Sequence, residues 1–268
     1  MAPQLLAPIG NQANMAYGIA NKKRKGCFEW DSTFWLGMLL EYVGTTAAVF
    51  FIWGARSLLY FLSANRECCA AGRVEATLAA AFAYAMVAYG IGWLRGGHAN
   101  PVISLAFMIA QKITFLHMLL LWIVQFLGAL TAGGLLRFLF YAYEPTLGTP
   151  VPYAGFTDGR VVFLEALALF VIALMLLCRE KCGIISAKMY FLAVGTVGFT
   201  LMQFTGASLN PFAQIGVAVW SGTWTSHWAY WVGPFVGAAL AAAVFIFAVF
   251  TTRENIIEWK ASQKAQRG

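Results

Sequence analysis

The chain has 268 residues, of which 60% are hydrophobic and only 11% are charged, and its mean hydropathy is +0.70. This composition is typical of a polytopic membrane protein and excludes an ordinary soluble enzyme. The net charge of +7 does not indicate binding to nucleic acid, because the basic residues gather at the chain ends and in loops, as positive charge does on the cytosolic side of a membrane.

Residues 1–32 form a basic N-terminal segment that contains the run Lys22-Lys23-Arg24-Lys25. It holds no apolar stretch with a small-residue cleavage site, so a secretory signal peptide is not expected. A cytosolic basic flank to the first helix explains these residues better than an organelle-targeting segment, which stays the minority alternative.

Six apolar runs predict six membrane-spanning helices, at about residues 34–61, 74–93, 115–140, 161–178, 187–204 and 228–251. In the third run, the small residues Gly128 and Ala129 after Gln125 favour close approach of a neighbouring helix. The polar stretch 141–160 separates two half-repeats, 33–140 and 161–252, and a basic tail, 253–268, follows.

Two Asn-Pro pairs each predict a short helix that opens from a loop. Asn100-Pro101 and Asn210-Pro211 place a good N-cap before a proline in the first helical turn. About nine or ten apolar residues follow each pair, which covers roughly half of a ~30 Å hydrocarbon core. Two such half-helices that enter from opposite faces can meet at the midplane with their positive dipole ends together.

Both halves have the same order: a span with an embedded glutamate (Glu41 or Glu165), a second span, an Asn-Pro half-helix and a third span. Because three spans are an odd number, the second half must be inverted relative to the first. The predicted fold is therefore an all-α membrane protein with six spans and two re-entrant half-helices in an inverted repeat.

The distribution of basic residues predicts an integral multi-pass protein with both termini in the cytosol. One side holds the N-terminal cluster, Arg95, Lys112, Arg179, Lys181, Arg253, Lys260, Lys264 and Arg267. The other side holds Arg66, Arg73 and Arg160.

Five motifs in order resemble the aquaporin, or major intrinsic protein, family over about residues 34–251. They are Glu41-x-x-Gly44-Thr45, His98-Ala99-Asn100-Pro101, Gln125-x-x-Gly128-Ala129, Thr205-Gly206-x-x-Leu209-Asn210-Pro211 and His227-Trp228-Ala229-Tyr230-Trp231-Val232-Gly233-Pro234. The resemblance implies a right-handed bundle of six helices with two half-helices, in a homotetramer with one pore per subunit. It also implies that Glu41 and Glu165 accept hydrogen bonds from backbone N–H groups of the re-entrant loops. We expect His98 to line the cytosolic vestibule.

The two asparagines are the expected centre of the pore, with Pro101, Pro211, Val102 and Phe212 beside them. Each half-helix brings roughly half a positive elementary charge to this point. Asn100 and Asn210 can each donate an N–H to a passing water. That water then points its hydrogens outward, which interrupts a proton wire and repels cations.

The sequence departs from the family pattern beside both asparagines. Val102 and Phe212 stand where the pattern usually has alanine, and Ala213 stands where it usually has an arginine that guards the outer constriction. Counting from each Asn places the remaining constriction positions at Ala80, Gly198 and Ala207. The resulting apolar ring is either wide and open or filled by the neighbouring rings of Phe82, Phe199 and Phe212. Gln214 stands where glycerol-conducting members usually have aspartate, so glycerol is not the favoured solute.

The predicted function is a passive channel for water or small uncharged solutes. The alternative is a non-conducting subunit that serves as a scaffold in a larger membrane complex. An ion-coupled transporter is disfavoured because the two embedded acids are needed by the fold. Membrane lipid and further copies of the chain are the expected partners. No catalytic group, cofactor or metal site is expected, and the five cysteines lack metal-ligand spacing.

Overall fold

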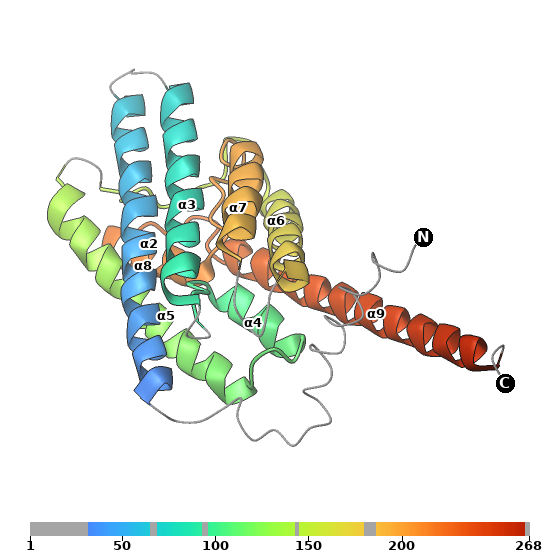
Figure 1. Cartoon of the computed structure of the whole chain (residues 1–268). Helices are drawn as coiled ribbons and strands as arrows, with labels where there is room; N and C mark the ends of the chain where they lie inside the picture. The colour runs from blue at the N-terminus through green and yellow to red at the C-terminus, as the bar shows by residue number, and fades with distance from the viewer. Residues whose placement is uncertain (1–31, 65–68, 93–95, 143–144, 180–185, 266–268) are drawn as a thin grey trace.

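The computed structural model describes residues 32–64, 69–92, 96–142, 145–179 and 186–265. Eight helices lie within these residues (Figure 1). They are α2 (Ser32–Ala64), α3 (Cys69–Ile91), α4 (Pro101–Ile109), α5 (Phe115–Phe140), α6 (Asp158–Arg179), α7 (Ala187–Leu201), α8 (Pro211–Ser221) and α9 (Ala229–Ala265).

Five of these helices, α2, α3, α5, α6 and α9, are long and apolar enough to cross a membrane. The sixth predicted span is α7, an apolar helix of 15 residues that begins at the predicted residue and ends three residues early. At 1.5 Å per residue it is about 22 Å long, which is shorter than a typical hydrocarbon core. Turns over residues 202–205 follow it and lead into the second re-entrant loop.

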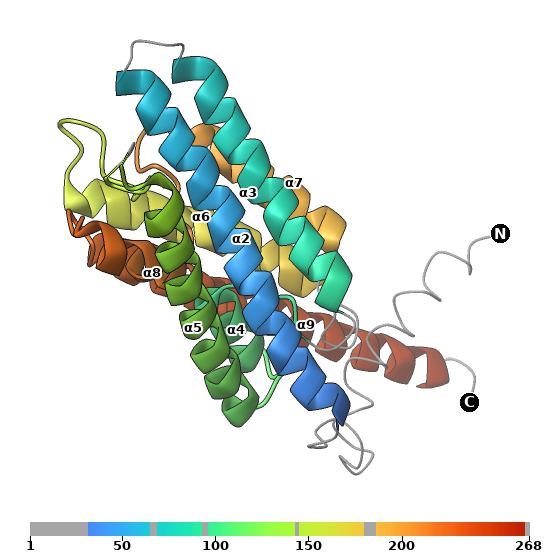
Figure 2. The ribbon, with the colours of Figure 1, turned by 90° about the vertical axis from the view of Figure 1, so that its left-hand side faces the viewer.

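The helix contacts follow the inverted repeat. α2 packs on α3 and α5, while α6 packs in the same way on α7 and α9. The two halves meet where α3 lies beside α7, and both half-helices fill the gap between α5 and α9. Figure 2 shows α2 and α3 side by side with α7 next to α3. Exchanging the halves therefore maps these contacts onto one another, as a repeat of the two halves requires.

Glycines allow helix backbones to touch at three contacts. A Cβ at Gly128 of α5 would lie 2.8 Å from the Tyr42 carbonyl oxygen of α2. A Cβ at Gly133 would overlap the backbone of Gly216 in α8, and one at Gly237 of α9 would overlap the α6 backbone. The predicted close approach at residues 125–129 is therefore confirmed, because small residues let two helix backbones meet.

The polar tail continues the last helix. α9 runs through Ala265, whereas the apolar pattern of the last span ends near residue 251. Residues 253–265 contain several good helix formers, so the helix can continue after the apolar run ends. The basic run Lys22–Lys25, together with Arg66, Arg95 and Lys181, lies outside the described residues, as do Cys27, Cys68 and Cys182.

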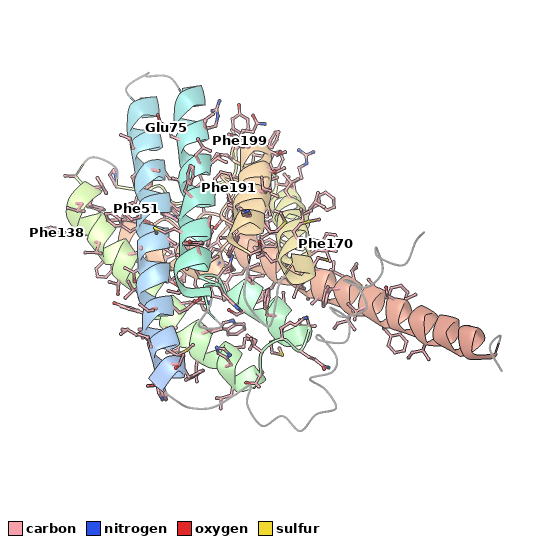
Figure 3. The ribbon with its side chains drawn as sticks, in the orientation of Figure 1. Phe51, Glu75, Phe138, Phe170, Phe191 and Phe199 are labelled. Carbon is pink, nitrogen blue, oxygen red and sulfur yellow. The ribbon has the colours of Figure 1, made fainter. Side chains whose placement is uncertain are left out.

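Many aromatic side chains face away from the bundle. Figure 3 labels Phe51, Phe138 and Phe199, which are exposed on α2, α5 and α7. Phe82 is 61% exposed and Phe199 is 50% exposed. Neither ring is packed inside the bundle, so the idea that these two rings fill the outer constriction stays an untested expectation that their exposure does not support.

Candidate functional site

Each half-helix begins where the Asn-Pro pair predicts. Asn100 caps α4, and its side-chain oxygen accepts from the Val102 N–H at 3.0 Å. Asn210 caps α8, and its oxygen accepts from the N–H groups of Phe212 and Ala213, both at 3.2 Å. These bonds satisfy N–H groups that a helix start leaves without an intrahelical partner.

The asparagines also tie the two half-helices together. Asn100 Nδ2 donates to the Leu209 carbonyl oxygen at 2.7 Å, and Asn210 Nδ2 donates to the Ala99 carbonyl oxygen at 2.7 Å. Leu209 and Ala99 immediately precede the two asparagines. Each Asn therefore binds the loop that leads into the other half-helix, and the two helix N-termini meet inside the bundle.

The two re-entrant loops repeat one unusual backbone shape. Positive φ angles occur one and three residues before each Asn: at Ala99 (47°) and Gly97 (79°), and at Leu209 (56°) and Ala207 (46°). Left-handed backbone at a residue with a side chain is unfavourable and persists where surrounding contacts hold it. Buried carboxylates supply those contacts in both loops.

Glu41 holds the first loop. Its carboxylate accepts from the Gly97 N–H, from the Ala99 N–H at 2.7 Å and from Gln125 Nε2 at 2.8 Å. Gln125 also donates to the Ser104 hydroxyl at 3.1 Å, which links α5 to α4. The fully buried acid on α2 therefore orders a loop more than fifty residues away.

Glu165 holds the second loop with a different third partner. It accepts from the Ser208 N–H at 3.1 Å, the Leu209 N–H at 2.9 Å and the Thr205 hydroxyl at 2.7 Å. Thr205 belongs to the same loop and also accepts from the Ala207 N–H at 3.0 Å. The acid on α6 is likewise fully buried.

Two tyrosines that the sequence analysis missed lie where the half-helices meet. Tyr84 on α3 and Tyr190 on α7 are stacked, with ring centroids 5.0 Å apart. The Tyr84 hydroxyl accepts a second bond from Asn210 Nδ2 at 3.0 Å, and the Tyr190 hydroxyl donates to the His98 carbonyl oxygen at 2.7 Å. The signal for Tyr84 is its place well inside a span, away from the interfacial belt, which indicates a buried polar partner. Tyr190 lies near the start of α7 and carries no such signal.

The predicted vestibule residue His98 is fully buried. Its Nδ1 lies 3.0 Å from the Ser104 hydroxyl, and its ring packs against Phe107 at 4.8 Å between centroids. The side chain therefore supports the start of α4 in this structure. Its role in a vestibule stays a prediction.

Phe212 points away from the meeting point of the half-helices. Its ring contacts Trp122 and Phe126 of α5 and Trp231 of α9, at 5.6 to 6.0 Å between centroids. Val102, its counterpart in α4, is completely buried. The larger side chain is thus accommodated between helices.

The four predicted constriction residues are all buried, and their role stays a prediction. Ala80 lies on α3 and Gly198 on α7, and the neighbouring Thr77 of α3 packs directly against Gly198. Ala207 and Ala213 lie in the second loop and in α8. Among the described residues, no group of three or more histidine, cysteine, aspartate or glutamate side chains is placed to hold a metal.

Arg56 is a second functional candidate that the sequence analysis missed. It is 2% exposed, and its Nη2 donates to the Ala207 carbonyl oxygen at 2.5 Å. An arginine within an apolar run is rare enough to be a site hypothesis by itself. The topology prediction did not include Arg56, because it used basic residues outside the spans or at their ends.

Comparison with known proteins identifies relatives along most of the chain. Residues 29–245 match the family model described as "Major intrinsic protein". The chain is 34% identical over 232 residues to "Aquaporin TIP1-1" of Arabidopsis thaliana, which covers 81% of this chain and 89% of that protein. It is 26% identical over 240 residues to "Aquaporin-1" of Homo sapiens, which covers 86% of this chain and 89% of that protein.

A solved structure has the same fold. The chain matches the structure titled "X-ray structure of the aquaglyceroporin from Plasmodium falciparum" with a TM-score of 0.69 and 17% sequence identity. The match covers 79% of this chain and 95% of that chain. At this identity the likeness concerns the fold alone.

Proposed function

The chain belongs to the major intrinsic protein family and is a membrane channel for water and small uncharged solutes, and we propose where its pore lies. The solute passes between Asn100 and Asn210. The crossing bonds between the half-helices carry this proposal. They hold two helix N-termini and two side-chain amides at one buried point. The scaffold alternative is not favoured, because the two relatives described above are named as aquaporins.

The electrostatics of this point favour neutral solutes. Two helix N-termini bring roughly half a positive elementary charge each, and a cation loses hydration there without gaining an anionic partner. Within the described residues, Asn100 Nδ2 has one protein acceptor, so its second N–H is available to a passing oxygen. A water that accepts this bond turns its hydrogens away from the amide. This orientation opposes proton transfer along the row of waters in the pore.

Tyr84 replaces the second asparagine donor with a hydroxyl. Its oxygen accepts from Asn210, so its own hydrogen is available for donation to a water in the path. The stacked ring of Tyr190 takes up further space beside it. We therefore expect water to pass more readily than glycerol or urea.

We assign passive diffusion, without a catalytic step or ion coupling, as the whole activity. The carboxylates of the buried acids Glu41 and Glu165 accept hydrogen bonds from loop N–H groups, so their role is to hold the loops in place. The residues Ala80, Gly198, Ala207 and Ala213 are proposed as the outer constriction, with Val102, Phe212, Pro101 and Pro211 around the midplane.

We propose a homotetramer in the lipid bilayer. An apolar hollow of about 590 Å³ lies on the surface between α3 and α7, and its lining includes Phe82, Met86, Phe191 and Leu192. Exposed apolar surface of this kind is covered by lipid or by a second copy of the chain. Native mass spectrometry from detergent tests the number of subunits, and a monomer under mild conditions contradicts the proposal.

We also propose that both termini are cytosolic, as the basic residues predict. An epitope tag at each end, probed in cells before and after permeabilisation of the plasma membrane, tests this topology. Detection of either tag in intact cells contradicts it.

Stopped-flow light scattering on proteoliposomes tests conduction. Vesicles with the wild-type protein should shrink much faster than protein-free vesicles under an impermeant sugar, and glycerol and urea should be reflected almost as well. Tyr84→Trp serves as the matched control, because a larger ring at the same position should bring shrinkage close to that of bare lipid. If vesicles with folded wild-type protein shrink no faster than protein-free vesicles, the channel proposal is contradicted and the scaffold function is favoured.

A further inference from the structure

Arg56 is a buried cation near the outer end of α2. Its guanidinium carbon lies 4.8 Å from the centre of the Trp53 ring, one helical turn earlier. Placing a charge inside an apolar bundle is costly, so such residues usually serve a transport path or a specific partner. The packing around Arg56 shows that its partner is the second re-entrant loop.

The guanidinium lies against the backbone just before α8. Nη2 donates to the Ala207 carbonyl oxygen at 2.5 Å, and a Cβ built on Gly206 would lie 3.8 Å from Nη1. The charge is also close enough to interact electrostatically with Tyr84 and Glu165. Arg56 therefore lies between the outer end of the bundle and the point where the half-helices meet.

The connection between the two halves folds inward over this arginine. Gly148 has φ of +66°, and a Cβ there would lie only 2.6 Å from the Arg56 Cβ. Pro150 contacts Gly206, and its carbonyl oxygen accepts from Gln214 Nε2 at 3.3 Å. Three separate segments, α2, residues 148–150 and the second re-entrant loop, thus pack together at Arg56.

We propose that Arg56 is the charge-selecting residue at the outer end of the channel. Ala213, at the start of α8, has no polar side chain, and Arg56 brings a guanidinium to the same loop from a membrane-spanning helix instead. This inference rests on the proposed path between the two asparagines. It names the residue that keeps cations out of that path.

The proposal follows from the charge and the donors of a guanidinium. A fixed positive charge raises the energy of a cation that approaches through a low-dielectric wall, and water does not pay this penalty. The planar fork also keeps several N–H groups in a fixed geometry, which a lysine ammonium does not. The bond to Ala207 holds the fork at the loop.

The experiment compares three variants in proteoliposomes, with water permeability and sodium influx measured on the same vesicles. Arg56→Gln removes the charge and keeps an N–H donor for the Ala207 carbonyl oxygen. We therefore expect the variant to fold. We expect its sodium influx to rise at least about tenfold over wild type, which corresponds to a barrier lowered by about 1.4 kcal/mol. Arg56→Lys keeps the charge without the planar fork, so its sodium influx should lie well below that of Arg56→Gln.

The third variant returns a guanidinium to the same region from another element. Arg56→Gln combined with Ala213→Arg should restore exclusion of sodium. Arg137→Gln is the matched control, because Arg137 on α5 is exposed and binds the Trp220 carbonyl oxygen at the opposite end of α8 from Asn210. This control should leave sodium influx unchanged.

The outcomes separate the inference from the proposed function. If wild-type vesicles conduct water and Arg56→Gln excludes sodium as well as Arg56→Lys does, the inference is overturned and the channel stands. If wild-type vesicles shrink only as fast as bare lipid, both are overturned. A rise in sodium influx for Arg137→Gln equal to that of Arg56→Gln also overturns the inference, because the effect then does not depend on position.

Discussion

The loop before α4 and the loop before α8 share one backbone plan but differ in the side chains that bind them. Both have positive φ one and three residues before the Asn, and both lie against a buried glutamate. The first loop takes its third carboxylate donor from α5, through Gln125, whereas the second uses its own Thr205. Arg56 and Tyr84 both bind the second loop, through Ala207 and Asn210. The two loops are therefore held by buried acids in the same way, while the second loop also bonds to polar side chains from α2 and α3.

The largest expected effect is common to both loops. Glu41→Ala and Glu165→Ala each leave three buried donors without an acceptor, and each orphan costs about 1–3 kcal/mol, so we expect little folded protein from either variant. Size-exclusion chromatography with thermal challenge measures this. Normal folding of one variant would show that the two loops do not depend equally on their acids.

The glutamine variants test the same two loops without removing the acceptor. Glu41→Gln and Glu165→Gln keep an acceptor oxygen and remove the charge. We expect Glu165→Gln to lower the melting temperature more, because Arg56 interacts electrostatically with Glu165. Equal melting temperatures would contradict this difference between the halves.

The next effect distinguishes the residues that follow the two prolines. Phe212→Ala removes a ring packed among three aromatic side chains and should cost about 3–5 kcal/mol, while Val102→Ala should cost about 2 kcal/mol. Denaturant unfolding in detergent gives the two values. Phe212→Leu is the control that retains most of the volume, and a loss from it as large as that from Phe212→Ala would contradict the cavity explanation.

A smaller effect compares the two tyrosines through the same chemical change. Tyr84→Phe removes the hydroxyl, releases the second N–H of Asn210 to donate in its place, and leaves more room for a passing water. Water permeability should rise about two- to threefold, the change produced by a barrier lowered by roughly half a kcal/mol. Tyr190→Phe removes a bond to a backbone carbonyl and should leave permeability unchanged. Equal permeability of the two variants contradicts the asymmetry.

The smallest expected effect concerns acid at the corner before α9. Burial lowers the pKa of His227, and its Nε2 accepts from Trp231 Nε1 at 3.1 Å, which requires a neutral ring at that nitrogen. The unfolded chain therefore binds a proton first as the pH falls. The neutral His227 ring therefore contributes its full share to the folding stability above about pH 6.5, and this share is lost as the pH falls below that value. Melting temperatures at pH 7.5 and 5.5 should differ more for wild type than for His227→Gln, and an identical difference would contradict this.

Local chemistry made much of the fold predictable. Asn100 and Asn210 mark their helix starts because an N-cap and a following proline act within one turn. The small residues near Gly128 likewise indicate a close helix contact before its partner is known. Arg56 and Tyr84 could not be placed in the same way. Their partners, Ala207 and Asn210, lie more than a hundred residues away, and only the folded chain brings them together.

The glycine contacts between α2 and α5, α5 and α8, and α6 and α9 have a mechanical consequence. Two backbones that already touch have no compressible layer of side chains between them, so these pairs resist sliding or tilting against one another. The stacked tyrosines between α3 and α7 are instead side chains, whose rotation needs no such displacement. Any fluctuation in the width of the passage should therefore arise from ring rotation within a stiff frame, and not from movement of whole helices.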